Sequence, residues 1–166
     1  MTRSRASRAV PPAPISTDAP LAELVSCSEL PWFPFLVEGM QLKLCRVSRS
    51  TGAISLLARV VPGTEVYSHY NHGLAVVYTI SGQWRYREAE WLATSGDVVV
   101  APAGSTRTFE TVGAWPAEVF IQLAGPVEFR DANDQTICIE NAETLHGRYL
   151  AHCALHGIPA VDLTGA

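Results

Sequence analysis

The sequence lacks any apolar run of the roughly 20 residues that a membrane-spanning helix needs. It also lacks a basic excess, because 12 Lys and Arg residues stand against 16 Asp and Glu residues, for a formal net charge of −4. Nucleic acids are bound mainly through clustered positive charge on the protein. The composition therefore predicts neither a membrane nor a nucleic-acid partner.

The four cysteines form no C-x-x-C pair. Scattered cysteines of this kind are typical of reduced thiols that are buried as small apolar residues in a cytosolic protein. A secretory signal is not expected, because the arginines near the N-terminus are followed by prolines instead of an apolar segment. We therefore predict a cytoplasmic protein.

The length of 166 residues predicts one domain with a substantial core. Residues 1–20 contain four prolines and three arginines but no aromatic residue, which predicts an extended or disordered arm. Residues 21–166 are then the single folded domain.

Many short segments of strand-like composition follow Met40, separated by turns such as Pro62-Gly63 and Ser81-Gly82. Closely spaced short strands favour an all-β sandwich or barrel over alternating strands and helices. Near the C-terminus, apolar residues recur at helical spacing until Gly157. This pattern predicts a C-terminal helix over about residues 141–157.

Two patterns of small residues and polar residues follow one another in the middle of the chain. The first contains Gly63, His69 and Gly82, and the second contains Gly96, Pro102, Gly104 and Arg107. Together they resemble the two signature motifs of the cupin superfamily, which implies an all-β double-stranded β-helix, or jelly roll.

Two longer segments, "WRYREAEWLATSGDVVVAPAGSTRTF" and "GPVEFRDANDQTI", resemble a narrower group. This is the ChrR-like branch that includes 2,4'-dihydroxyacetophenone dioxygenase and acetylacetone-cleaving dioxygenase, and the resemblance covers about residues 31–157. It implies Fe(II) held by three histidines, sometimes with a carboxylate, and oxidative cleavage of a carbon–carbon bond next to a carbonyl. It also implies a homodimer.

The iron ligands of that branch are mostly replaced in this chain. His69 matches the first histidine, but Asn71 stands in the second position, Val76 near the acidic position and Arg107 in the position of the last histidine. An arginine is always protonated and has no lone pair to donate to a metal. We therefore predict that the protein uses no metal cofactor, with Fe(II) as the alternative.

In the Fe(II) alternative, the metal would be held partly by residues that lie outside the family's usual ligand positions. Its ligands would be His69, His72 and Glu88, where Glu88 lies near the position of a carboxylate ligand in the relatives. Side chains alternate along a strand, so His72 points away from His69 unless a β-bulge turns it inward.

Alternation and the resemblance together predict the pocket. We expect His69, Arg107 and Glu88 to be catalytic, with His69 as a proton-transfer group whose pKa lies near neutrality. Arg107 is expected either to bind an oxyanion or to pair with Glu88. The predicted substrate-binding residues are Asn71, Tyr78, Trp84, Tyr86, His72 and Phe109.

The predicted function is metal-independent acid–base chemistry on a small carbonyl or aromatic, polyketide-like compound. The reaction would pass through an enolate and would be a cyclisation, isomerisation, dehydration or decarboxylation. Two other functions stay open. The protein could be an Fe(II)-dependent dioxygenase that cleaves a β-diketone or a hydroxyacetophenone-type substrate, or a non-catalytic cupin that binds a small ligand.

Overall fold

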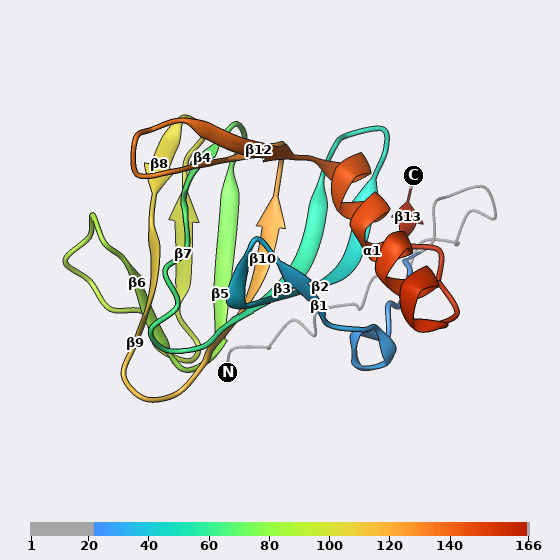
Figure 1. Cartoon of the computed structure of the whole chain (residues 1–166), viewed down its shortest axis with the longest axis horizontal. Helices are drawn as coiled ribbons and strands as arrows, with labels where there is room; N and C mark the ends of the chain where they lie inside the picture. Colours follow the sequence, from blue (N-terminus) through green and yellow to red (C-terminus); the bar gives the residue numbers. More distant parts are fainter. Residues whose placement is uncertain (1–21, 166) are drawn as a thin grey trace, which may run out of the picture.

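The computed structural model describes residues 22–165, which form two β-sheets, a two-stranded ribbon and one α-helix (Figure 1). The arm predicted for residues 1–20 lies outside the described residues. A short 3-10 turn, η1 (Cys27–Glu29), precedes the first strand. No helix in residues 22–165 combines the length and the apolar character that a bilayer-crossing helix requires.

The larger sheet has the strand order β1-β2-β3-β10-β5-β7, and β13 pairs with β2. All these pairs are antiparallel except β13 with β2. The strands are β1 (Phe33–Phe35), β2 (Val37–Ser48), β3 (Ile54–Val60), β5 (Ala75–Ser81), β7 (Val98–Ala101), β10 (Ala117–Leu123) and β13 (Thr164–Gly165).

The smaller sheet has the order β12-β11-β4-β8 and is also antiparallel. Its strands are β4 (Ser68–Asn71), β8 (Ser105–Arg107), β11 (Val127–Arg130) and β12 (Thr136–Glu140). A separate two-stranded ribbon consists of β6 (Gln83–Tyr86) paired antiparallel with β9 (Phe109–Val112). Figure 1 shows the smaller sheet along one end of the long strands and the ribbon at the far side from the helix. The architecture confirms the predicted all-β jelly roll.

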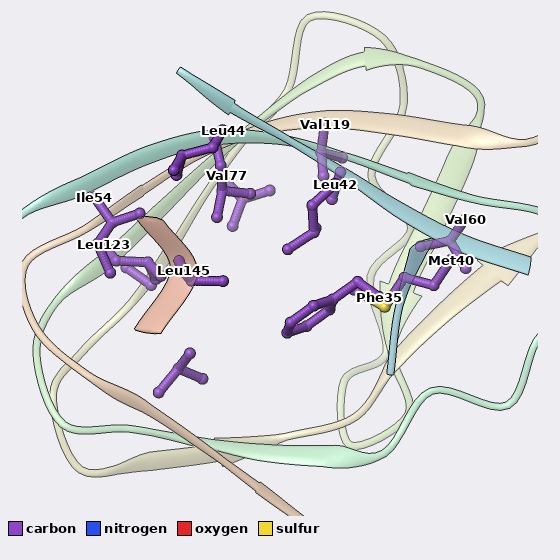
Figure 2. Close-up of a cluster of buried hydrophobic side chains, with 14 of the residues drawn as sticks. Phe35, Met40, Leu42, Leu44, Ile54, Val60, Val77, Val119, Leu123 and Leu145 are labelled. Atoms are coloured by element: carbon purple, nitrogen blue, oxygen red, sulfur yellow. The ribbon is translucent and has the colours of Figure 1, made fainter. Parts of the chain in front are cut away.

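The core lies on the inner faces of these sheets because apolar and polar residues alternate along the strands. In β3, Ile54, Leu56, Ala58 and Val60 are buried and the residues between them are only partly buried. Figure 2 shows side chains from several strands and from the helix converging on one interior space. An inner face of this kind both stabilises the fold and lines the cavity described below.

The helix α1 (Ala142–His156) occupies the predicted C-terminal position. It begins with a capping box, in which the side chain of Asn141 accepts from the Thr144 N–H and the Thr144 hydroxyl accepts from the Asn141 N–H. It ends at Gly157, whose φ of 64° closes the helix in the left-handed conformation. Its buried residues Leu145 and Tyr149 pack one face of the helix against the barrel.

Candidate functional site

The site begins with two neighbouring strands of the smaller sheet. β4 and β8 pair so that His69 lies opposite Arg107 and Asn71 lies opposite Ser105. On its other side His69 faces Phe129 of β11. Directly opposite residues project from the same face of a sheet, with their Cβ atoms about 5 Å apart. The pairing therefore places His69 and Arg107 next to one another on neighbouring strands.

An inner cavity of about 80 Å³ lies between the sheets. Its wall is almost wholly apolar and is built from residues such as Leu42, Leu56, Val77 and Leu123. The polar side chains in the wall are few, and the residues concerned are His69, Asn71, Tyr86 and Glu140. Phe109 also lines it. A ligand that enters this space must be small and mostly apolar.

His69 presents both ring nitrogens to open space. Its ring packs edge-on against Tyr86 and beside Phe129. It makes no hydrogen bond with a described residue, and no buried polar side-chain atom among residues 22–165 is left without a partner. Its nitrogens are therefore open to the cavity or to the groove beside it.

The pKa of His69 is lowered to about 4. Burial of the ring is the main cause, the charge of Glu88 opposes it and the charge of Arg107 adds to it. The predicted pKa near neutrality is therefore wrong, because the ring is more deeply desolvated than the sequence indicates. At neutral pH the imidazole is uncharged and has a lone pair available to accept a proton.

Arg107 does not line the inner cavity. It lies in an adjoining outer groove of about 730 Å³, which runs between β7 and the segment that follows β6. Its Nη1 donates to the Thr106 carbonyl at 2.7 Å. Among residues 22–165 no carboxylate lies within 4 Å of its guanidinium. Most of the hydrogen-bonding capacity of this cation therefore stays available to a ligand.

Glu88 is exposed in the same groove and does not form an ion pair with Arg107, which was one of the two alternatives for this arginine. Its Oε2 accepts from the Thr108 N–H at 3.0 Å instead. The pKa of Glu88 lies below its ordinary value: desolvation would raise it, and the hydrogen bonds to Thr108 and the charge of Arg107 more than offset this. The two charges are thus close enough to influence one another without direct contact.

Three residues that were predicted to bind substrate line neither the inner cavity nor the outer groove, namely Tyr78, Trp84 and His72. Tyr78 is 44% exposed, because β5 buries Ala75, Val77 and Thr79 and so turns Tyr78 to the outer face. Trp84 is fully buried and lines neither cavity. It stacks on Phe109 and donates its Nε1–H to the Thr79 hydroxyl at 2.8 Å, which makes it part of the core.

His72 is the third. No bulge interrupts β4, so His72 points away from His69, and its Nε2 lies 3.3 Å from Glu128 on the opposite face of the sheet. Thr136 and Arg130 also bind this carboxylate, and the pKa of Glu128 is lowered to about 2 chiefly by the hydrogen bond from Thr136. The expectation that His72 reaches the pocket is therefore wrong.

The donor set does not fit the iron that the resemblance implies. Non-haem iron of the kind that the resemblance implies is held by imidazole and carboxylate ligands, and in the described part of the chain His69 is the one imidazole in the cavity wall. Asn71 donates its amide to Ser105 at 3.3 Å, and Arg107 lies beside His69. The alternative ligands His72 and Glu88 lie apart, and residues 22–165 contain no metal-binding group of three His, Cys, Asp or Glu side chains.

Glu140 is a cavity residue that the sequence reasoning missed. It is fully buried at the end of β12 and joins the wall of the inner cavity. Arg148 donates to its Oε1, with Nε at 2.9 Å, and Thr144 donates to its Oε2 at 2.7 Å. The sequence offers one sign of this buried position: a single glutamate at the end of an apolar strand segment, just before the residue that caps the helix. Its oxygens are already occupied, so its role is structural.

One protein-family model matches the chain. Residues 21–123 match the ChrR cupin-like domain, which is more than half of the chain. The chain belongs to the ChrR cupin-like family. This confirms the cupin superfamily and the branch that the sequence patterns indicate.

Several solved cupin structures are similar to this chain over most of its length. An RmlC-like cupin from Ralstonia eutropha is 31% identical, with a TM-score of 0.81 over 86% of this chain and 94% of that one. A putative acetylacetone dioxygenase from Methylibium petroleiphilum is 19% identical, with a TM-score of 0.71 over 81% and 99% of the two chains. An acetylacetone dioxygenase from Acinetobacter johnsonii is 18% identical, with a TM-score of 0.69 over 84% and 97%. The last two share the fold. No curated protein matches the chain.

Proposed function

We propose that this cupin catalyses metal-independent enolisation of a small carbonyl compound, as an isomerase or lyase. The observation that carries the proposal is the placement of Arg107, a guanidinium without a carboxylate partner within 4 Å in residues 22–165, directly opposite an uncharged His69. A fixed cation beside a proton acceptor favours enolate formation, because the base removes the proton and the cation stabilises the oxyanion.

In the proposed step His69 takes a proton from the carbon next to the carbonyl. The C–H bond breaks, its electron pair forms the carbon–carbon double bond of the enolate, and the carbonyl oxygen takes the negative charge beside Arg107. Return of the proton to a different atom or face of the enolate gives an isomer, and loss of a leaving group from the next carbon gives a lyase product, so no oxidant or reductant is consumed. The new oxyanion also stabilises the imidazolium formed at the same time, which offsets the low basicity of His69.

The other residues of the site have supporting roles in this proposal. The apolar wall keeps water from the reacting carbon and strengthens the attraction between the guanidinium and the enolate. Asn71 is 2% exposed and has one amide hydrogen bond, to Ser105, so its position in the wall is well defined. It would orient the polar end of a ligand that reaches the cavity.

The test is exchange of substrate protons with deuterium. Metal-free protein, prepared with a chelator, is mixed with small carbonyl compounds such as acetylacetone, hydroxyacetone and 2-oxobutanoate in deuterated buffer, and exchange is followed by proton NMR. We expect exchange above the buffer rate for at least one compound, and a loss of about 100-fold or more in His69→Gln and Arg107→Met. The matched control is Arg85→Met, because Arg85 is exposed and pairs with Glu110 away from both cavities.

Full exchange activity in either site variant would overturn the assigned roles. Tight binding of a compound without any exchange or product would mean that the protein binds a small ligand and is not an enzyme.

A further inference from the structure

The inner cavity and the outer groove meet at a single side chain. Tyr86 lines both spaces, whereas His69 and Phe109 line only the cavity and Arg107 and Glu88 line only the groove. The Tyr86 ring packs edge-on against His69 on one side and against Trp91 on the other. Tyr86 therefore forms the partition between an apolar compartment and a polar one.

The hydroxyl of Tyr86 has no partner in the described part of the chain. The residue is 4% exposed and makes no hydrogen bond with residues 22–165, yet no buried polar side-chain atom there is left unsatisfied. Its Oη must therefore open into one of the two compartments. Burial raises the pKa of Tyr86 to about 12, with Arg107 opposing and Glu88 adding to the effect, so the phenol stays protonated and can donate.

The inner compartment limits the size of what it can take. Its volume of about 80 Å³ is roughly half that of an apolar cavity of ~150 Å³ that binds benzene. The inner compartment therefore favours an alkyl group over an aromatic ring as its occupant. A short alkyl chain of a few carbons fits both the size and the apolar wall.

The outer compartment offers one cation to an anion. Arg107 is the one basic residue among those that line the groove, and Glu88, Glu90 and Asp97 make the rest of its charge negative. A polyanion would be repelled by these carboxylates. A single carboxylate matches a single guanidinium, whose planar fork binds two neighbouring oxygens at once.

We infer that the ligand of this site is a short-chain 2-oxo acid bound across both compartments, with Tyr86 as the residue that sets its length. The guanidinium of Arg107 binds one carboxylate oxygen and the neighbouring 2-oxo oxygen, and the Tyr86 hydroxyl donates to that 2-oxo oxygen. The alkyl end passes Tyr86 into the inner cavity, where C3 lies next to His69. The inference rests on the proposed function in treating cavity and groove as one site.

Calorimetric titration of the full chain tests the inference without any need for turnover. The probes are pyruvate, 2-oxobutanoate, 2-oxopentanoate and phenylpyruvate, together with the neutral ketone 2-pentanone. We expect 2-oxobutanoate and 2-oxopentanoate to bind at least tenfold more tightly than 2-pentanone and phenylpyruvate. Arg107→Met should weaken 2-oxobutanoate at least 30-fold, Tyr86→Phe about tenfold, and Arg85→Met not at all.

A second variant tests the length limit set by the tyrosine. Tyr86→Ala removes the partition and should bind phenylpyruvate at least tenfold more tightly than the wild type does, while thermal melts show that the variant is folded. Should it fail to fold, Tyr86→Leu, which keeps an apolar core contact but is shorter, serves the same purpose.

Equal affinity for 2-pentanone and 2-oxopentanoate, or unchanged 2-oxobutanoate binding in Arg107→Met, would overturn the inference. The two proposals fail differently. Deuterium exchange with acetylacetone, combined with no 2-oxo acid binding, contradicts the ligand inference alone. Selective 2-oxo acid binding without exchange contradicts the enolisation alone.

Discussion

His69 and Arg107 lie directly opposite one another on β4 and β8, and the cation helps to keep the imidazole uncharged. The imidazole of His69 therefore lies beside a side chain that carries a fixed positive charge. A fixed cation near the ring disfavours protonation of the resting imidazole and favours an anion that forms beside it.

The pH dependence of catalysis should follow the lowered pKa of His69. The proton-accepting form is the neutral ring, which is present above a pKa of about 4. The value of kcat/KM for deuterium exchange should therefore stay level from neutral pH down to about pH 5 and fall as the pH drops through 4. A fall centred near the ordinary histidine pKa of about 6.5 would show that the ring is not desolvated as described.

The same histidine should make folding stability depend on pH. Its pKa is lower in the folded chain than in the unfolded chain, so between about pH 6.5 and pH 4 the unfolded state binds more protons. This contribution to stability is complete above pH 6.5 and is lost as the pH falls through the folded pKa, by up to about 3 kcal/mol. Urea unfolding at pH 7, 6, 5 and 4 should show a shallower decline for His69→Gln than for the wild type. Parallel curves would contradict the shift.

Removal of Arg148 should destabilise the protein through Glu140. The carboxylate of Glu140 is fully buried, and Arg148 is the one cation that pairs with it among the described residues; its other side-chain partners, the Thr144 hydroxyl and the Cys138 thiol, are uncharged. Arg148→Met leaves a buried charge without its counter-ion, which should cost about 2–4 kcal/mol in urea unfolding, since the arginine is itself partly exposed. Arg85→Met, which breaks an exposed pair with Glu110, should cost less than about 1 kcal/mol. Equal costs would show that burial of Glu140 is not the cause.

Gly82 should tolerate no side chain, for two separate reasons. Its φ is 77°, and an added Cβ would collide with the backbone carbonyl of Pro116. Gly104 has a similar φ of 81° but has only the Tyr70 hydroxyl near, at 3.8 Å. Gly104→Ala should therefore cost about 1–2 kcal/mol from backbone strain. Gly82→Ala should cost clearly more or prevent folding, as measured by thermal melts and soluble yield. Equal effects would mean that the close approach at Gly82 relaxes easily.

The fold could be predicted because its signals are local. Glycines with positive φ at Gly63, Gly82, Gly96 and Gly104 mark the turns between short strands, and only glycine takes such angles at little cost. The capping box at Asn141 and the glycine at position 157 likewise mark the helix ends. These features depend on neighbours in sequence, so the printed residues suffice to find them.

The site was only partly predictable, because side-chain direction depends on strand parity and packing. Alternation alone places His69 and Asn71 on one face, as the structure has them. It misplaces Tyr78, since the sequence does not show that Thr79 is the inward residue bound to Trp84. The small volume of the cavity and the division of space by Tyr86 arise from the packing of many strands, which no single segment reveals.

Metal content, measured together with activity in one preparation, tests the central claim most directly. Protein purified without chelator is analysed for iron and zinc by mass spectrometry, and its deuterium exchange activity on 2-oxobutanoate is compared before and after chelator treatment. The account predicts much less than one metal ion per chain and an unchanged exchange rate after treatment. One iron or zinc ion per chain, with exchange that disappears on chelation and returns on adding that metal, would contradict it.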